Sequence, residues 1–318
     1  MIEVKNLSKK YGGHVAVKDV SFKVEDGQVL GLLGLNGAGK STIMNIMTGY
    51  ISMTTGSVEI GGYDILTQPT EAKKHIGYLP ELPPLYPDMT VKEYLYFMYD
   101  LKKVRLPRAP HIEEICSLVK IDDVYGRLIK NLSKGYRQRV GIAQALLGNP
   151  DVIILDEPTV GLDPKQIIEI RNLIYHLGRN HTVIVSSHIL SEIQTVCDRI
   201  IVINGGNIIA DGAPSELSRM ISGSNILTLR IKATGSDAKV SAMKLLGNIK
   251  GVSDVYCTDS IEDNCFDYTI YVEDGADVRS TVINRMIEQG FTVLQLSAEE
   301  LNLEQIFLRL TETEEVEQ

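Results

Sequence analysis

The chain has 318 residues, 44% of them hydrophobic, and its 32 Lys and Arg against 41 Asp and Glu give a formal net charge of −9. This length and composition support packed cores in one large domain and a smaller one. The negative charge argues against a protein that coats nucleic acid, and apolar stretches such as 152–155 and 200–203 are far shorter than the roughly 20 residues of a transmembrane helix.

The cysteines and the first residues indicate a reducing compartment. The cysteines are far apart and lack the spacing of metal ligands or a CxxC pair, so we expect reduced thiols. They are Cys116, Cys197, Cys257 and Cys265. Residues 1–6 lack the charged-then-apolar pattern of a secretion signal, which predicts a cytoplasmic protein.

From residue 1 to about 220, short Val, Ile and Leu runs alternate with segments of helical period. This alternation is typical of an α/β domain around a largely buried sheet. Strands are expected at 28–33, 152–155 and 182–186. Between about 82 and 132 the strand signals disappear. Two amphipathic segments, 91–101 and 112–119, predict a helical insertion there, with the proline-containing stretch 107–110 separating them.

A second pattern begins after the Ser-Gly-Ser break at 222–224 and predicts a separate domain over 222–318. Its elements follow the order strand, helix, strand, strand, helix, strand, which matches a ferredoxin-like α+β fold. These elements are expected at 226–231, 238–246, 252–257, 266–272, 278–289 and 291–296. A last helix over 301–310 and an acidic tail over 311–318 complete the expected domain.

Residues 34–41 match the phosphate-loop pattern GxxxxGK[ST] between an expected strand and an expected helix. Glycines let several backbone N–H groups face one point, and the helix start adds its positive dipole end. We therefore expect Lys40 to contact the β- and γ-phosphates, Ser41 to bind Mg²⁺, and Thr42 to add a polar contact. The backbone of the loop comes from Gly34, Asn36, Gly37, Ala38 and Gly39. A glycine-rich turn without a ligand is the alternative.

Two adjacent carboxylates follow the apolar strand at 152–155. Side chains alternate along a strand, so both can point to one site only where the strand ends. We expect Asp156 to hold Mg²⁺ through water and Glu157 to orient and deprotonate the attacking water. A solvated acidic turn after a core strand is the alternative.

Two further motifs carry less information on their own. His188 follows another buried strand and is placed to reach the same γ-phosphate, although such a histidine is also found as an ordinary surface or core residue. Ser133 is a natural N-cap for a helix to about residue 147, and Gly135 leaves its first turn open. This helix start is either an anion site or a plain capped helix.

The order of these motifs over about residues 1–218 resembles the nucleotide-binding domain of ABC transporters. The resemblance implies a P-loop ATPase that binds ATP and Mg²⁺, with Tyr11 stacked on adenine, Asp163 in the D-loop and His188 as the switch histidine. It also implies that Ser133 and Gly135, in a signature sequence at 132–138, bind the γ-phosphate held by the opposite subunit. A head-to-tail homodimer would then complete two sites.

The chain departs from this pattern in two places. Lys134 and Tyr136 stand where the signature usually has glycine and glutamine, which alters the expected interface contacts. Glu81 stands where the loop at 76–81 usually ends in a glutamine that touches Mg²⁺ and water. A carboxylate only accepts hydrogen bonds, whereas an amide also donates. We expect Glu81 to ligate the metal, and slower hydrolysis is the alternative.

Segments 78–81 and 85–91, with these departures, resemble the ABC-2 type exporters, a subgroup that includes gliding-motility, sodium, drug and bacitracin-resistance ATPases. Segment 303–308 resembles the end of the accessory domain in that subgroup. The resemblance implies a separate membrane permease whose coupling helix enters the helical insertion, and a peripheral location on the inner face of the cell membrane. Four aromatic residues of the insertion either line that socket or belong to the hydrophobic core of the insertion. They are Tyr94, Tyr96, Phe97 and Tyr99.

Other functions remain open on the sequence alone. A non-transport ABC ATPase acting on ribosomes or DNA usually has two nucleotide domains or a long coiled-coil insert, and neither is present. An ATP-dependent switch with little turnover is the second alternative, which Glu81 makes conceivable. The transported substrate would contact the membrane subunit, so the sequence of this chain does not indicate it.

Overall fold

A computed structural model describes residues 1–221, 225–233, 238–259, 262, 264–273 and 276–299. The chain divides into two compact units, Met1–Pro214 and Ser215–Gln318, and each is described by itself. The helix expected at 301–310, the acidic tail at 311–318 and the segment 303–308 lie outside the described residues.

The first unit is built on a six-stranded sheet in the order β10-β9-β3-β8-β7-β6. Its central strands are parallel, and β10 pairs antiparallel with β9. Strands β3, β7 and β8 are buried along their whole length, which is why they read as continuous apolar runs. The strands are β3 Val29–Leu33, β6 Ile76–Leu79, β7 Val152–Leu155, β8 Thr182–Ser187, β9 Arg199–Asn204 and β10 Asn207–Gly212.

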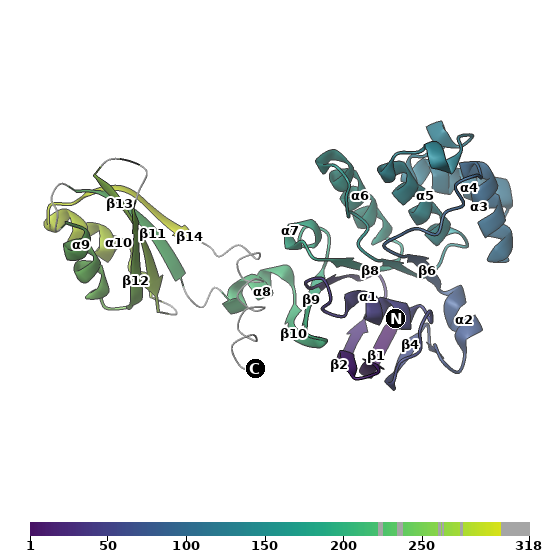
Figure 1. The fold of residues 1–318 in the computed structure, drawn as a ribbon, viewed down its shortest axis with the longest axis horizontal. Coiled ribbons are helices and arrows are strands. Elements are labelled where there is room, and N and C mark those ends of the chain that lie inside the picture. The colour runs from purple at the N-terminus through teal and green to yellow at the C-terminus, as the bar shows by residue number, and fades with distance from the viewer. Residues whose placement is uncertain (222–224, 234–237, 260–261, 263, 274–275, 300–318) are drawn as a thin grey trace. The chain divides into compact units, whose positions relative to one another are not determined.

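A second, antiparallel sheet of the first unit has the order β2-β1-β4-β5. Its strands are β1 Ile2–Tyr11, β2 His14–Val24, β4 Thr55–Ile60 and β5 Tyr63–Asp64. Helix α1, Lys40–Met47, lies against this sheet in Figure 1, and its apolar side chains share one core with residues of both sheets. The phosphate-loop helix is therefore held by apolar contacts on more than one side.

Helices α3, α4 and α5 group together on the other side of the parallel sheet (Figure 1). They are α3 Val91–Leu101, α4 Arg108–Val119 and α5 Lys134–Leu146, joined by the short turns η1 Asp122–Val124 and η2 Ile129–Asn131. The remaining helices of the first unit are α2 Pro69–Lys74, α6 Pro164–Leu177 and α7 Leu190–Ile193. Helix α8, Pro214–Ile221, starts at the last residue of the first unit and otherwise belongs to the second.

The helical insertion differs from the expectation at one boundary. Helix α4 begins at Arg108 and not at 112, so Pro110 belongs to its first turn. Proline is tolerated there because the first N–H groups of a helix have no intrahelical partner. Of the aromatic cluster, Tyr94 and Tyr99 are buried, so the core alternative is correct for these two, whereas Phe97 is 38% exposed.

The second unit contains a four-stranded antiparallel sheet in the order β12-β13-β11-β14, with α9 and α10 on its apolar face. Its elements are β11 Asn225–Lys232, α9 Ala238–Gly247, β12 Val252–Asp259, β13 Cys265–Val272, α10 Arg279–Glu288 and β14 Thr292–Glu299. This is the ferredoxin-like arrangement that the element order predicts, and both parts of the predicted fold class are confirmed.

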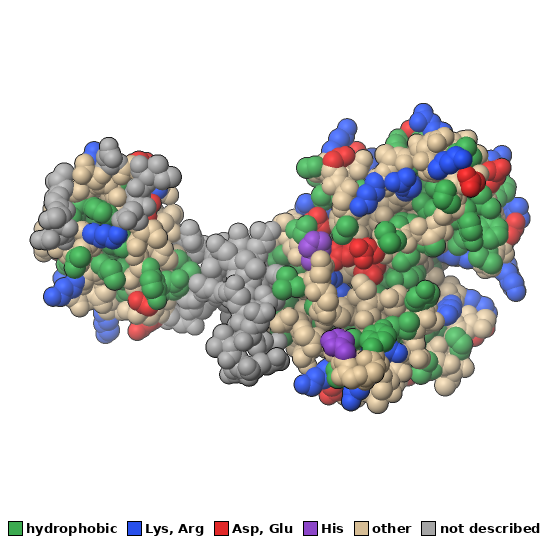
Figure 2. Space-filling view, in the orientation of Figure 1, with side chains coloured by type: hydrophobic (Ala, Val, Ile, Leu, Met, Phe, Trp, Pro, Cys, Tyr) green, Lys and Arg blue, Asp and Glu red, His purple; other side chains and the backbone are tan. Residues whose placement is uncertain are grey.

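Charged side chains of both signs are distributed over the visible surface (Figure 2). Figure 2 shows Lys and Arg side chains in small separate groups on the visible face, with Asp and Glu between them. Within the described ranges, no helix combines the length and the apolar character that crossing a bilayer requires.

Candidate functional site

The phosphate loop connects β3 to α1 and is shaped by glycines. Gly39 has φ +110° at the N-cap of α1, and a Cβ there would lie 2.7 Å from the carbonyl oxygen of Ala16. A Cβ on Gly34 would lie 2.5 Å from the carbonyl oxygen of Ile203. Side chains are thus excluded by close backbone contacts, which leaves the loop free to present backbone N–H groups to a ligand.

Lys40 is the first residue of α1 and is only 5% exposed. Its Nζ donates hydrogen bonds to the carbonyl oxygens of Gly34 at 2.7 Å and Leu35 at 3.3 Å. The same ammonium lies 3.2 Å from Glu157 Oε1. The lysine charge is therefore held under the loop, at the place where phosphate is expected.

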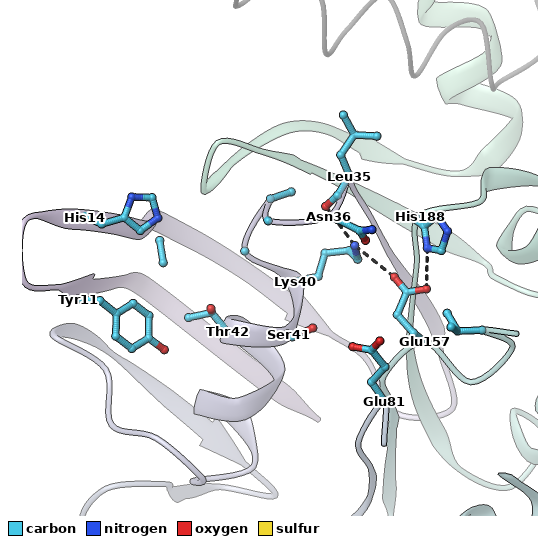
Figure 3. Close-up of a pocket in the computed structure, with 15 residues that line it drawn as sticks. Tyr11, His14, Leu35, Asn36, Lys40, Ser41, Thr42, Glu81, Glu157 and His188 are labelled. Carbon is cyan, nitrogen blue, oxygen red and sulfur yellow. Dashed lines mark hydrogen bonds and ion pairs between the residues drawn. The ribbon is translucent and has the colours of Figure 1, made fainter. Parts of the chain in front are cut away.

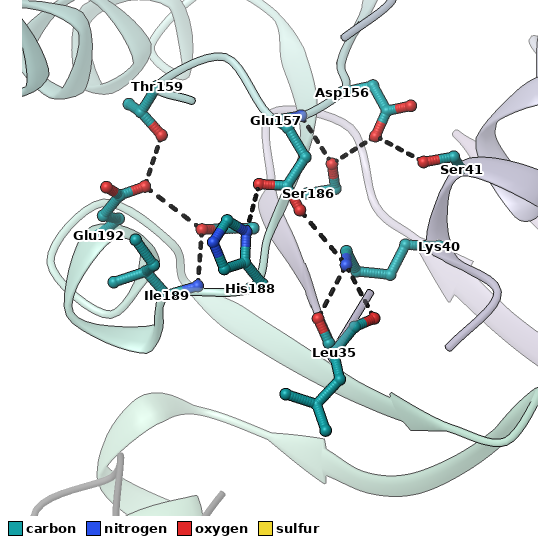
Figure 4. A network of polar contacts seen from close by, with 12 residues as sticks. Leu35, Lys40, Ser41, Asp156, Glu157, Thr159, Ser186, His188, Ile189 and Glu192 are labelled. Carbon is teal, nitrogen blue, oxygen red and sulfur yellow. Dashed lines mark hydrogen bonds and ion pairs between the residues drawn. The ribbon is translucent and has the colours of Figure 1, made fainter. Parts of the chain in front are cut away.

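The carboxylates at the end of β7 face α1 and the end of β8 (Figure 4). Asp156 Oδ1 accepts hydrogen bonds from Ser41 Oγ at 3.2 Å and from Ser186 Oγ at 2.7 Å. Burial raises the pKa of the Asp156 carboxyl above its ordinary value, while the two serine hydrogen bonds oppose that shift. Burial of Asp156 thus opposes its ionisation, and the hydrogen bonds from Ser41 and Ser186 favour it.

Glu157 has a backbone conformation that is uncommon for a residue with a side chain, with φ +46°. Such a conformation costs about 1–3 kcal/mol and is found at functional sites when the surroundings enforce it. Here its N–H donates to Ser186 Oγ at 2.8 Å, and its Oε2 lies 2.9 Å from His188 Nδ1. The other oxygen, Oε1, is buried, and no donor in the described structure is aligned for a hydrogen bond to it.

Lys40, Ser41, Glu157 and His188 line one cavity of about 490 Å³ in the first unit (Figure 3). Its walls come from the phosphate loop, the β1–β2 hairpin and the ends of β6, β7 and β8. The sequence-predicted residues that line it are Tyr11, Asn36, Gly37, Ala38, Gly39, Lys40, Ser41, Thr42, Glu81, Glu157 and His188. The structure thus brings together residues that lie up to 177 positions apart, from Tyr11 to His188.

Asp156, Gly34 and three other predicted site residues do not line this cavity. Asp156 lies behind Ser41, and Gly34 lies under the loop. Ser133, Gly135 and Asp163 are elsewhere in the first unit.

The start of α5 has its own surroundings. Ser133 is its N-cap and accepts a hydrogen bond from Tyr136 N at 3.3 Å, and Tyr136 Oη donates to Asp123 Oδ2 at 2.6 Å. A second cavity of about 390 Å³ lies beside this helix start, and Gly135, Tyr136 and Asp163 contribute to its wall. A side chain on Gly135 would collide with the Gln166 amide of α6, so the signature loop and α6 are in close contact.

The sequence reasoning missed residues of the polar network behind the cavity. Ser186 accepts from the backbone of Glu157 and donates to Asp156, which fixes the two carboxylates relative to each other. The pair Ser186 and Ser187 at the end of an otherwise apolar strand was the available signal. His14 also lines the cavity, across the β1–β2 hairpin from Tyr11, and no spacing rule pointed to it.

The donor set is suitable for Mg²⁺. Ser41, Asp156 and Glu81 supply hydroxyl and carboxylate oxygens, which are the hard ligands that this ion prefers. The metal would be held next to the phosphate loop, where Ser41 and Asp156 already contact each other.

Comparisons with known proteins agree with this geometry. The family model described as "ABC transporter" matches residues 17–160. The linearmycin resistance ATP-binding protein LnrL of Bacillus subtilis is 31% identical, over 98% of this chain and 98% of its own length. The Nod factor export ATP-binding protein I of Rhizobium etli is 32% identical, over 98% of this chain and 93% of its own length. The bacitracin transport ATP-binding protein BcrA of Bacillus licheniformis is 37% identical, over 66% of this chain and 69% of its own length.

Among solved structures, a dimeric post-hydrolysis state of the ATP-binding cassette MJ0796, bound to ADP and Pi, superimposes with a TM-score of 0.62. It is 27% identical and covers 67% of this chain and 99% of its own. The sequence, the fold and the phosphate loop thus lead to one assignment. The chain belongs to the family of ABC transporter ATP-binding proteins and shares their P-loop α/β fold, ATP binding and ATPase activity.

Proposed function

We propose that this chain is the ATP-hydrolysing subunit of an ABC exporter and drives transport through a separate ABC-2 type permease. The names of relatives support export, because they include linearmycin resistance, Nod factor export and bacitracin transport. The observation that carries the catalytic part is Glu157, which lines the cavity and whose buried Oε1 forms an ion pair with Lys40 but has no aligned hydrogen-bond donor in the described structure. The cargo of the permease is not specified by this chain.

In this proposal the loop N–H groups and Lys40 bind the β- and γ-phosphates, and Tyr11, 49% exposed on the cavity wall, stacks on the adenine. Nucleotide binding would draw Lys40 toward the phosphates and weaken its ion pair with Glu157. Glu157 Oε1 then accepts a hydrogen bond from water and takes up its proton as the water attacks the γ-phosphate. His188 would donate from Nδ1 to Glu157 Oε2, and its imidazolium form would have a second N–H, on Nε2, to donate toward the same phosphate.

Mg²⁺, held by Ser41, Asp156 and Glu81, would neutralise charge on the β- and γ-phosphates. Glu81 is exposed on the cavity wall, so its carboxylate is free to turn toward the ion. Asp156 would be held ready by its two serine partners. Ionisation of Asp156, which burial disfavours, would be favoured again by the cation.

ATP-binding subunits of ABC transporters dimerise and pair with membrane permeases. For this chain we infer a head-to-tail homodimer in which Ser133 and Gly135 of one subunit bind the γ-phosphate held by the other. The separation of these residues from the phosphate-loop cavity within one chain supports this arrangement. Asp163, at the N-cap of α6, belongs to the same proposed interface. Hydrolysis would remove the phosphate that bridges the two subunits.

We assign residues 1–220 to the nucleotide-binding domain, with the helical subdomain at about 82–132, and residues 222–318 to an accessory domain. The exposed pair Tyr86 and Phe97, with ring centroids 5.5 Å apart, supports a permease socket on the helical subdomain.

The protein would be located in the cytoplasm, at the inner face of the membrane, where the permease holds it. No nucleic-acid partner is proposed, in keeping with the net charge of −9.

The Glu157→Gln variant tests the catalytic assignment. It should bind ATP and form a stable dimer, while steady-state hydrolysis falls by about 10²–10⁴-fold because the general base is lost. Phosphate release and gel filtration with ATP measure both effects. Asp151→Asn, a carboxylate change just before β7, is the matched control and should hydrolyse ATP normally. Undiminished hydrolysis by Glu157→Gln would remove Glu157 from this role.

The Asp156→Asn variant tests the metal ligand through pH. Because the folded-state pKa is raised, ionised Asp156 lowers the free energy of unfolding of the nucleotide-free protein at neutral pH. An asparagine oxygen can still accept both serine hydrogen bonds, so the variant should melt higher than the original at pH 7. The difference in melting temperature between the variant and the original protein should disappear as the pH falls to about 4, near the ordinary Asp pKa. A difference in melting temperature that is constant at every pH contradicts the raised pKa of Asp156. Normal Mg²⁺-dependent hydrolysis by Asp156→Asn contradicts its assignment as a metal ligand.

The permease partner is tested by purification from membranes in mild detergent. The chain should be recovered with one polypeptide that has several apolar spans, and Phe97→Asp should release it without changing the ATPase rate of the isolated chain. Leu118→Asp on α4, an exposed apolar residue like Phe97, is the control and should retain the partner. Recovery of ribosomes or DNA in place of a membrane protein would support a non-transport ATPase.

A further inference from the structure

A buried carboxylate outside the cavity connects the two loops that carry Glu157 and His188. Glu192 lies in α7, four residues after His188, and is only 7% exposed. One of its oxygens, Oε2, accepts hydrogen bonds from Thr159 Oγ1 and from Ser187 Oγ, the latter at 3.3 Å (Figure 4). Within the described structure no Lys, Arg or His forms an ion pair with it.

Burying a carboxylate without a cation costs free energy, so the presence of Glu192 at this position needs a physical reason. Both donors are themselves buried, with Thr159 at 6% and Ser187 at 1% exposure. Removing Glu192 would leave both hydroxyls without this acceptor. The cluster is therefore closed off from solvent and well defined, although it does not line the 490 Å³ cavity.

The positions of these donors relate the cluster to the catalytic residues. Thr159 follows Glu157 by two residues, and Ser187 directly precedes His188. Ser187 Oγ also accepts from Ile189 N at 3.0 Å, so one hydroxyl contacts the backbone on the far side of His188 as well. Glu192 thus joins the segment after Glu157 to the segment that holds His188.

The backbone does not provide this connection. The ladder between β7 and β8 ends at the pair Leu155 and Val185. Beyond that pair, the hydrogen bonds between the two segments in the described part of the chain involve side chains: through Ser186, directly between Glu157 and His188, and through Glu192. Glu157 is moreover held at φ +46°, which its surroundings must enforce.

We propose that Glu192 is a positioning residue that holds Glu157 and His188 in a fixed relation for hydrolysis, acting through Thr159 and Ser187. The inference rests on the proposed function, in which Glu157 and His188 face the γ-phosphate. Glu192, Thr159 and Ser187 do not line the cavity. Glu192 therefore affects the rate of the chemical step and leaves nucleotide affinity unchanged. A shift of about 1 Å in a reacting group can change a rate by 10²-fold.

The test uses the full chain and compares kcat for ATP hydrolysis with the dissociation constant of a fluorescent ATP analogue. Glu192→Leu, which removes the acceptor, should lower kcat by about 10–100-fold and change the dissociation constant less than twofold. Glu192→Gln should recover most of the rate, because both hydroxyls donate to a single oxygen that the amide retains.

Thr159→Val gives a second test that does not remove a charge. It should lower kcat in the same direction, Thr159→Ser should restore it, and the double variant Thr159→Val with Glu192→Leu should be no slower than Glu192→Leu alone. The matched control is Thr182→Val, which removes a buried hydroxyl at the other end of β8, where Thr182 Oγ1 accepts from Gly27 N at 3.0 Å. This control should keep its kcat.

The inference is overturned if Thr159→Val and Glu192→Leu hydrolyse ATP at the original rate, or if their effects on kcat multiply in the double variant. It is also overturned if kcat falls only in proportion to nucleotide affinity. The proposed function fails separately. In that case Glu157→Gln itself hydrolyses ATP at the original rate, whatever Glu192 does.

Discussion

The site depends on three ionisable side chains held out of water at the carboxyl ends of two parallel strands of one sheet. Lys40 follows β3, and Asp156 and Glu157 follow β7, with β8 between the two strands in the sheet. Buried charges are stable only when each has partners. Lys40 has two carbonyl oxygens and Glu157, and Asp156 has two serine hydroxyls. The sheet therefore fixes the distances that phosphoryl chemistry needs before a ligand binds.

The same arrangement includes irregular backbone at two places. The phosphate loop has Gly39 at φ +110°, and Glu157 adopts φ +46° directly after a buried strand. At the loop, the carbonyl oxygens of Ala16 and Ile203 leave no room for side chains on Gly39 and Gly34. At Glu157, Ser186 accepts a hydrogen bond from the backbone N–H. Left-handed backbone also occurs away from the cavity, as at Asn6 and Lys103, and among the non-glycine residues of this kind in the described structure Glu157 is the one that lines the cavity.

Much of this could be predicted from the sequence because local patterns carry it. The strand at 152–155 matches β7, the helix at 91–101 matches α3, and the phosphate loop lies between β3 and α1 as its pattern requires. The start of α4 was placed too late because a proline in a first turn resembles a separator. The contact of Glu192 with Thr159 joins loops 33 residues apart, and no periodicity or spacing rule encodes such a contact.

The central claim is that each ATP is bound by the phosphate loop of one chain and the signature helix start of another. It is tested most directly by mixing two defective chains in a Glu157→Gln background, one with Lys40→Ala and one with Ser133→Arg. Each alone should stay monomeric with ATP. The mixed dimer contains one intact composite site, so the account predicts that the mixture forms ATP-dependent dimers with one nucleotide each. A mixture that stays as monomeric as its two components would contradict the account.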